Sequence, residues 1–176
     1  MTHQLSDLPD LNNVLIRRAT PADGPAVQQF VFATLRSYGI EPDPDGLDAD
    51  VVAFGTAGDG PALEWVADLA GVPVGSVVLT PDDKGDAKLS KLFVDASYRG
   101  HGIGRGLLLH AVAEGRARGF RRLHLETRAA YREAVHLYEA TGWVRGPDLP
   151  PGYGPDRTYS FDLQQRGAAS EEGQPR

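Results

Sequence analysis

The stretch that decides the fold lies at residues 91–105, which read Lys-Leu-Phe-Val-Asp-Ala-Ser-Tyr-Arg-Gly-His-Gly-Ile-Gly-Arg. It begins as an apolar strand, and apolar residues at helical spacing follow from Ile103 onward. Glycine occupies alternate positions at the junction, at Gly100, Gly102 and Gly104. Backbone N–H groups without neighbouring side chains can approach an anion closely, and a helix start favours negative charge. The segment therefore predicts a phosphate or pyrophosphate site, the alternative being a glycine-rich turn that only starts a helix.

The spacing of the glycines narrows the choice of phosphate ligand. A P-loop would need a Gly-Lys-Ser/Thr ending, which the chain lacks. A dinucleotide fingerprint needs glycine at relative positions one, three and six, and the sixth positions here are Arg105 and Leu107. A nucleotide bound through the same loop is kept as an alternative.

On both sides of this stretch, the pattern of apolar residues predicts short strands and helices. Strands are expected at residues 14–16, 63–69, 72–80, 88–94, 123–127 and 158–163, and helices at 21–39, near 51–54, at 103–118 and at 134–141. Tight turns between the second, third and fourth strands indicate an antiparallel meander, and strand 88–94, helix 103–118 and strand 123–127 form a crossover with parallel strands. We expect a mixed α/β fold with a mostly antiparallel central sheet and one parallel pair.

Composition limits the class of protein. The chain has 176 residues, 41% hydrophobic and 24% charged, which predicts one folded domain over residues 14–163 between a flexible N-terminus, 1–13, and a disordered tail, 164–176. A net charge of −6 argues against nucleic-acid binding. The chain has no cysteine, and its five histidines show no ligand cluster, so we expect neither a thiol nucleophile nor a metal. Without a membrane span or a signal peptide in the sequence, we expect a cytoplasmic protein with no membrane partner.

Two segments together resemble a known family. The pattern Arg99-x-x-Gly102-x-Gly104 resembles the acetyl-CoA signature of the GNAT superfamily of N-acetyltransferases. Residues 133–143, with Ala134, Tyr138 and the Gly142-Trp143 pair, resemble the later motif of that superfamily, and the order of elements agrees from about residue 14 to residue 163. The resemblance implies a GNAT-like fold with flanking helices and a splayed parallel strand pair. It also implies acetyl-CoA as co-substrate.

The resemblance also implies roles for particular residues. The pyrophosphate of coenzyme A would be held by Arg99, Gly100, His101, Gly102, Ile103, Gly104 and Arg105. The pantetheine arm would bond to the backbone of Leu92, Phe93 and Val94. Tyr138 would lie near the coenzyme sulfur, where a phenol can give a proton or a hydrogen bond to the leaving thiolate; the alternative is a core tyrosine.

The sequence departs from the family pattern at two places. Tyr131 stands where the family often has an asparagine that contacts the coenzyme, and Lys88 and Ser90 stand where it often has a glutamate base. Glu126, at the end of the strand 123–127, is then the carboxylate nearest the expected cleft and our candidate base. The alternatives are a strand-end acid without a catalytic role and a proton route through solvent.

The expected reaction is acetyl transfer from acetyl-CoA to an amine on a small molecule or a peptide terminus. The amine would attack directly in a ternary complex, because no cysteine can carry the acyl group. The acidic residues of segment 41–48 would border the acceptor and attract a cationic amine, or form only a solvated loop. A non-catalytic acyl-CoA-binding module is the second reading, and a homodimer through a sheet edge or the late strands stays open.

Overall fold

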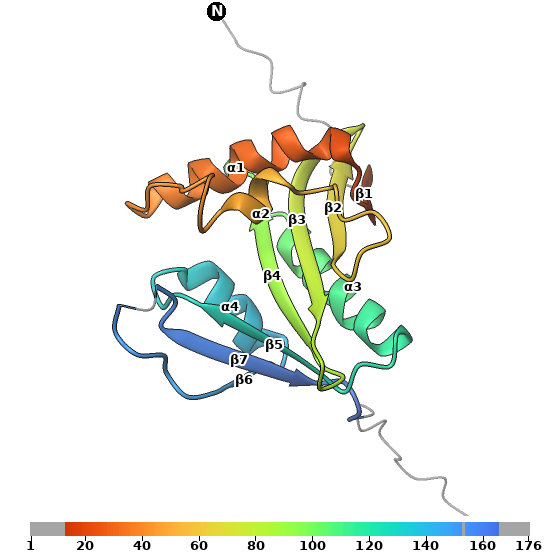
Figure 1. The fold of residues 1–176 in the computed structure, drawn as a ribbon, viewed down its shortest axis with the longest axis vertical. Coiled ribbons are helices and arrows are strands. Elements are labelled where there is room, and N and C mark those ends of the chain that lie inside the picture. The colour runs from red at the N-terminus through yellow and green to blue at the C-terminus, as the bar shows by residue number, and fades with distance from the viewer. Residues whose placement is uncertain (1–12, 153, 166–176) are drawn as a thin grey trace, which may run out of the picture.

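A single seven-stranded sheet runs through the described residues, 13–152 and 154–165, of this computed structural model (Figure 1). Its order is β1-β2-β3-β4-β5-β7-β6. The strands are β1 Val14–Arg18, β2 Leu63–Leu69, β3 Val72–Pro81, β4 Ala87–Val94, β5 Arg122–Thr127, β6 Val144–Arg145 and β7 Arg157–Asp162. The helices are α1 Gly24–Ser37, α2 Ala49–Val52, α3 Ile103–Ala117 and α4 Arg132–Ala140. Two 3-10 turns, η2 Pro21–Asp23 and η3 Ala96–Tyr98, precede α1 and α3.

The sheet is antiparallel except between β4 and β5, which confirms the predicted mixed fold. The parallel register joins Ala87 to Leu123 and Lys88 to His124 and goes no further. Beyond these pairs β4 and β5 diverge (Figure 1). The end of β4 that carries residues 92–94 is therefore free of a β5 partner, which gives the site its opening.

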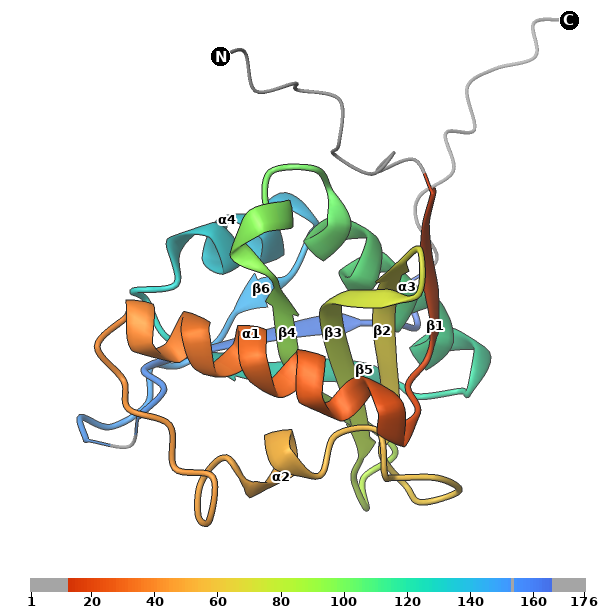
Figure 2. The same ribbon diagram turned by 90° about the horizontal axis from the view of Figure 1, so that it is seen from above.

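Helices cover both faces of the sheet (Figure 2). On one face α1 and α2 enclose a buried cluster of Val27, Phe30, Val31, Phe32, Leu35, Val51, Phe54, Val66 and Val78. On the other face α3 and α4 cover a larger cluster that includes Trp65, Leu79, Leu89, Leu107, Leu108, Ala111, Leu123 and Tyr159. Burial of these apolar side chains is the main stabilising contribution to the fold. The sheet thus separates two buried cores.

The expected elements are confirmed to within a few residues at their ends, with two additions, the turn η3 and the strand β6. Residues 21–23, expected as the first turn of the helix 21–39, form the separate turn η2. Both residues of β6 are exposed, so no apolar alternation marks it in the sequence. The predicted flexible N-terminus, 1–13, and disordered tail, 164–176, lie outside the described residues, apart from residues 13, 164 and 165.

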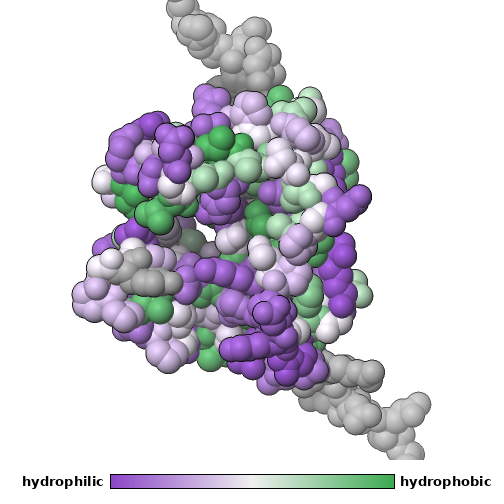
Figure 3. All heavy atoms as spheres, viewed as in Figure 1, coloured by the Kyte–Doolittle hydropathy of each residue, from purple (hydrophilic) through white to green (hydrophobic). Residues whose placement is uncertain are grey.

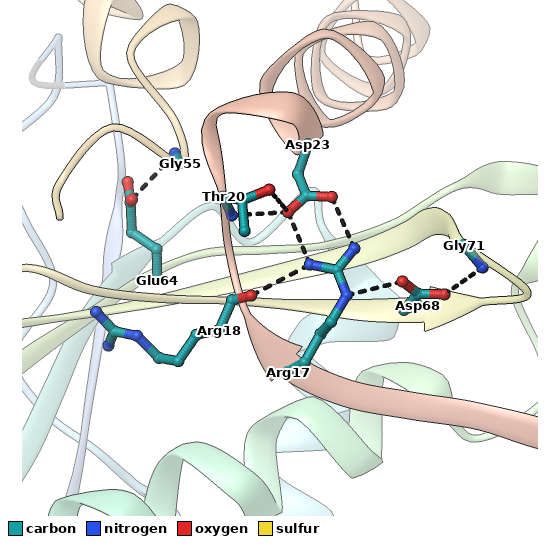
Figure 4. A network of polar contacts seen from close by, with 8 residues as sticks. All are labelled: Arg17, Arg18, Thr20, Asp23, Gly55, Glu64, Asp68 and Gly71. Atoms are coloured by element: carbon teal, nitrogen blue, oxygen red, sulfur yellow. Dashed lines mark hydrogen bonds and ion pairs between the residues drawn. The ribbon is translucent and has the colours of Figure 1, made fainter.

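A partly buried polar network ties β1 to the start of α1 (Figure 4). The guanidinium of Arg17 donates two hydrogen bonds of 2.8 Å to Asp23 and one of 2.8 Å to Asp68, and the Thr20 N–H donates to Asp23 at 2.7 Å. The hydrogen bond from Arg17 holds the pKa of the Asp23 carboxyl below its ordinary value. This contribution to stability is therefore present at neutral pH and is lost as the pH falls through the lowered pKa. The network anchors the N-terminal end of α1, whose other end reaches the site.

Candidate functional site

A cleft of about 470 Å³ lies beside the unpaired end of β4. Its lining comes from the C-terminal half of α1, the end of β4, the glycine-rich loop with the first turn of α3, and α4 with the turn before it. Figure 3 shows the surface hollowed between the part formed by α1 and the part formed by α4 and β7.

All the residues expected to contact the coenzyme line this cleft except one. They are Leu92, Phe93, Val94, Arg99, Gly100, Gly102, Ile103, Gly104 and Arg105. His101 is the exception: its side chain is exposed, and its Nδ1 lies 3.2 Å from the carbonyl oxygen of Tyr98. Thr34, Tyr38, Tyr98 and Glu133 also line the cleft, although the sequence did not predict a role for them there. Glu133 begins the later motif, and no local motif marks the other three.

The glycines have distinct structural reasons. Gly100 and Gly102 have φ angles of 78° and 80°, a region that favours glycine, and Gly102 is the N-cap of α3. The N–H groups of the first turn of α3 have no partner within the helix and so can bind an anion. Gly104 lies inside the helix, where an added Cβ would sit 3.5 Å from Val94 Cγ2 and 3.7 Å from Leu137 Cδ2. The missing side chain therefore keeps the space between β4 and α4 open.

A bulge changes the course of β4 just before the cleft. The register with β3 shifts between Ser76 and Val78, and Lys91 has a φ of 52°. The Ser76 hydroxyl donates to the Lys91 carbonyl oxygen at 2.7 Å and stabilises the bulge. Bulges re-aim the residues that follow them. Here the half-buried residues 92–94 follow, and they form the β4 wall of the cleft.

The two arginines of the loop differ in their surroundings. The Arg99 guanidinium donates from Nε to the Val94 carbonyl oxygen at 3.0 Å and from Nη2 to the Thr34 hydroxyl at 2.8 Å. Arg105 is exposed on the first turn of α3, and within 13–152 and 154–165 its guanidinium has no hydrogen-bond or ion-pair partner. Arg99 is thus bound to the protein, whereas Arg105 can offer its charge to a ligand.

Tyr138 lies in the core next to the cleft rather than on its surface. It is 4% exposed, and its ring centroid lies 5.8 Å from that of Trp143 and 5.6 Å from that of Tyr159. Its α4 neighbours Ala134 and Leu137 line the cleft. Burial raises the pKa of the Tyr138 phenol above its ordinary value, so the hydroxyl keeps its proton at neutral pH.

Glu126 lies on the opposite face of the sheet from Tyr138. Leu123 and Leu125 of β5 pack in the α3/α4 core, so the alternating side chains of His124 and Glu126 face the α1/α2 side. Glu126 Oε2 accepts from Lys88 Nζ at 3.0 Å, directly beyond the last registered pair of β4 and β5. Glu126 does not line the cleft itself, but it stands where the two strands part.

The mouth of the cleft carries two aromatic rings. Tyr38, at the end of α1, and Tyr131, before α4, have ring centroids 4.6 Å apart. Burial raises the pKa of Tyr131. In the nearby acidic segment, Asp43 and Asp48 each accept a hydrogen bond from a backbone N–H, at 3.1 Å and 2.9 Å, so part of its charge is already used locally.

Within residues 13–152 and 154–165, no cluster of three or more histidine, aspartate or glutamate side chains is arranged to hold a metal ion. None of the helices in those ranges is both long and apolar enough to span a bilayer.

A sheet that opens between its parallel strands, with a glycine-rich helix start at the opening, defines a class of acyl-coenzyme A-dependent transferases. Comparison with known proteins makes the assignment specific. The model of the Acetyltransferase (GNAT) family matches residues 29–143, and the chain belongs to this family of N-acetyltransferases.

Individual relatives agree with this assignment. The chain is 29% identical over 147 residues to the uncharacterized N-acetyltransferase YjgM of Escherichia coli K12. The matched region covers 76% of this chain and 86% of that protein. A GNAT acetyltransferase structure from Staphylococcus aureus Mu50 has a TM-score of 0.76 at 21% identity, covering 86% of this chain and 99% of that one. The PaiA N-acetyltransferase of Thermoplasma acidophilum, solved in complex with coenzyme A, has a TM-score of 0.69 at 17% identity, covering 85% and 99%.

Proposed function

We propose that this protein transfers an acetyl group from acetyl-CoA to an amine by direct attack in a ternary complex. The observation that carries the proposal is the cleft, which combines the free end of β4 with the glycine-rich start of α3. Family membership supports the reaction class, and the coenzyme A complex of PaiA supports the donor.

The donor fits the cleft in two parts. The free N–H groups at the start of α3 suit the pyrophosphate, and the exposed Arg105 adds positive charge beside them. Past the bulge, the backbone of residues 92–94 has no β5 partner and can bond to the amides of the pantetheine arm. The space that Gly104 leaves between Val94 and Leu137 admits the arm itself.

The transfer itself breaks one bond and forms another. The amine nitrogen bonds to the thioester carbonyl carbon, the C–S bond breaks, and the coenzyme leaves as a thiolate. The neutral hydroxyl of Tyr138 gives this thiolate a proton or a hydrogen bond. The proton that the amine loses passes to Glu126, directly or through water, from the α1/α2 side of the opening. The chain has no cysteine that could carry the acetyl group in between.

The acceptor is a small molecule or a peptide with a free amine. It would enter between the Tyr38–Tyr131 mouth and the face of β5 that carries Glu126. A second candidate function, a non-catalytic acyl-CoA-binding module, is favoured by one observation: β4 carries Lys88 where a base would suit the reaction, and the nearby carboxylate of Glu126 is paired with it.

Turnover on a panel of amines tests the proposal. The panel should hold primary alkylamines, arylalkylamines, polyamines and short peptides with free N-termini, and coenzyme A release should be followed with a thiol reagent. We expect release above the acceptor-free rate for at least one class, with the acetylated amine detected by mass spectrometry. Binding of acetyl-CoA in calorimetry without acceptor-dependent release on the whole panel would support the binding module instead.

Substitution of Glu126 by Gln tests the proton route. The amide keeps the shape of the carboxylate and removes its basicity, so we expect kcat at neutral pH to fall about 10²-fold. The loss should shrink as the pH approaches the amine pKa of about 10, where the free amine forms in solution. The pH–rate profiles of parent and variant on one acceptor give this result.

Lys88→Met is the matched control, because it breaks the same ion pair but leaves the carboxylate in place. It should retain most of the parent rate. Superimposed profiles for the parent and Glu126→Gln would mean that the proton leaves through solvent and that Glu126 is only the partner of Lys88.

A further inference from the structure

We infer that Arg99 serves the coenzyme site by holding the loop in position rather than by offering charge, and that Thr34 of α1 is the residue that fixes it. The inference rests on the proposed coenzyme site. Its basis is a pair of contacts: Arg99 Nε donates to the Val94 carbonyl oxygen at 3.0 Å, and Nη2 donates to the Thr34 hydroxyl at 2.8 Å. These contacts join three cleft-lining segments, namely the end of β4, the loop and α1.

Thr34 is oriented to accept this hydrogen bond. Its hydroxyl donates its only proton to the Phe30 carbonyl oxygen at 2.8 Å, one turn earlier in α1. Only the lone pairs of the Thr34 oxygen then remain available, so this oxygen accepts the hydrogen bond from Arg99. The residue is 8% exposed, so water competes little for this position. A buried acceptor fixed in this way selects a donor at one place, which a mobile surface contact would not do.

The Arg99 contacts also close the loop on itself. Val94 ends β4, and Arg99 directly precedes the glycine-rich turn, so the bond from Nε to Val94 spans the segment 95–98. Within that segment the Asp95 carboxylate accepts from the Ser97 N–H at 2.9 Å and supports η3. The N–H groups at the start of α3 thereby take a fixed place relative to β4. Without this closure the loop must be ordered when the ligand binds, which weakens affinity.

The chemistry of the guanidinium explains why arginine is needed here. Nε and Nη2 lie in one rigid plane and address two acceptors at once, whereas a lysine ammonium is a compact point charge on a flexible stem. A lysine at residue 99 would keep the charge beside the pyrophosphate and lose the two-point attachment. Arg105, which is exposed and without a partner among the described residues, offers the opposite case: a charge without attachment.

Calorimetric titration with coenzyme A distinguishes a positioning role of Arg99 from a role of its charge. Arg99→Lys is expected to weaken coenzyme A binding about 10-fold, and Thr34→Val, which keeps the shape of the side chain, by a similar factor. The double variant should bind within about twofold of Arg99→Lys, because Arg99→Lys has already lost the contact that Thr34→Val removes. Thr34→Ser should restore affinity. Arg105→Gln, which removes a charge that has no attachment to the protein, should weaken binding and reduce its salt dependence.

Several results would overturn the inference. If Arg99→Lys binds coenzyme A as tightly as the parent and only Arg99→Gln binds it more weakly, then Arg99 acts through its charge. If the losses of affinity add up in the double variant, or if Thr34→Ser binds coenzyme A as weakly as Thr34→Val, then Thr34 does not position Arg99. Thermal unfolding of each variant shows whether a loss of affinity merely follows a loss of stability, and affinity that tracks stability across the series also counts against the inference. A parent protein that binds no coenzyme A would instead contradict the proposed function.

Discussion

Gly104→Val should abolish acetyl-CoA binding and leave the fold intact. A Cβ at residue 104 meets Val94 Cγ2 at 3.5 Å and Leu137 Cδ2 at 3.7 Å, which are ordinary van der Waals distances, so the protein alone accepts it. The two methyl groups of valine would then fill the space between β4 and α4 beside the free N–H groups of the helix start. We expect affinity to fall by about 100-fold or more in calorimetry, since the arm can enter only by displacing packed walls.

Gly106→Val is the control for this prediction. It lies on the same helix, does not line the cleft, and its Cβ would meet Ile16 Cδ1 at 3.7 Å. It should carry the same helix-propensity change without a loss of affinity. Gly102 is a poorer site for the test because its φ of 80° makes valine strained whatever the ligand does. Parental affinity in a folded Gly104→Val protein would place the coenzyme elsewhere.

Tyr138→Phe should lower turnover about 10²-fold with little change in coenzyme affinity. The ring and its packing against Trp143 and Tyr159 are kept, and only the hydroxyl is lost. That hydroxyl has no hydrogen-bond partner in the described ranges, and it is neutral at pH 7, because a phenol is protonated there and burial only raises its pKa further, so it is available to a leaving thiolate. Steady-state kinetics with acetyl-CoA and one accepted amine give kcat, and calorimetry gives the affinity.

A second buried tyrosine provides the comparison. The Tyr159 hydroxyl donates to Glu139 Oε1 at 2.7 Å, so Tyr159→Phe removes a structural hydrogen bond. We expect that variant to lose some thermal stability and to keep its turnover. If Tyr138→Phe behaves in the same way, with kcat unchanged, then Tyr138 is a packing residue and the thiolate takes its proton from water.

The elements that surround the cleft could be predicted because local patterns encode them. The parallel pair followed from a strand, a helix and a strand in that order, and the start of α3 from glycines at alternate positions. The strand β6 was missed because its two exposed residues have no pattern, and it exists only by pairing with β7.

The sequence could not predict which residues the site residues contact. Thr34 and Arg99 are 65 positions apart, and the packing angle of α1 on the sheet decides whether they meet. Lys88 and Glu126 are 38 positions apart, and their pairing depends on the register at which β4 and β5 separate. Hydrophobic periodicity places a residue on a face of its own element but gives no distance to another element.

The short β4–β5 ladder has a consequence for how the molecule opens. Among the described residues, the backbone ladder between β4 and β5 consists of the pairs Ala87–Leu123 and Lys88–His124. Because this ladder is short, we expect β5 and β7 to exchange their amide protons more readily than the meander of β2, β3 and β4. A coenzyme lying between β4 and α4 would contact both sides of the opening and hold them together. The same opening that admits the donor would thus make the amide-exchange protection of β5 and β7 depend on its occupancy.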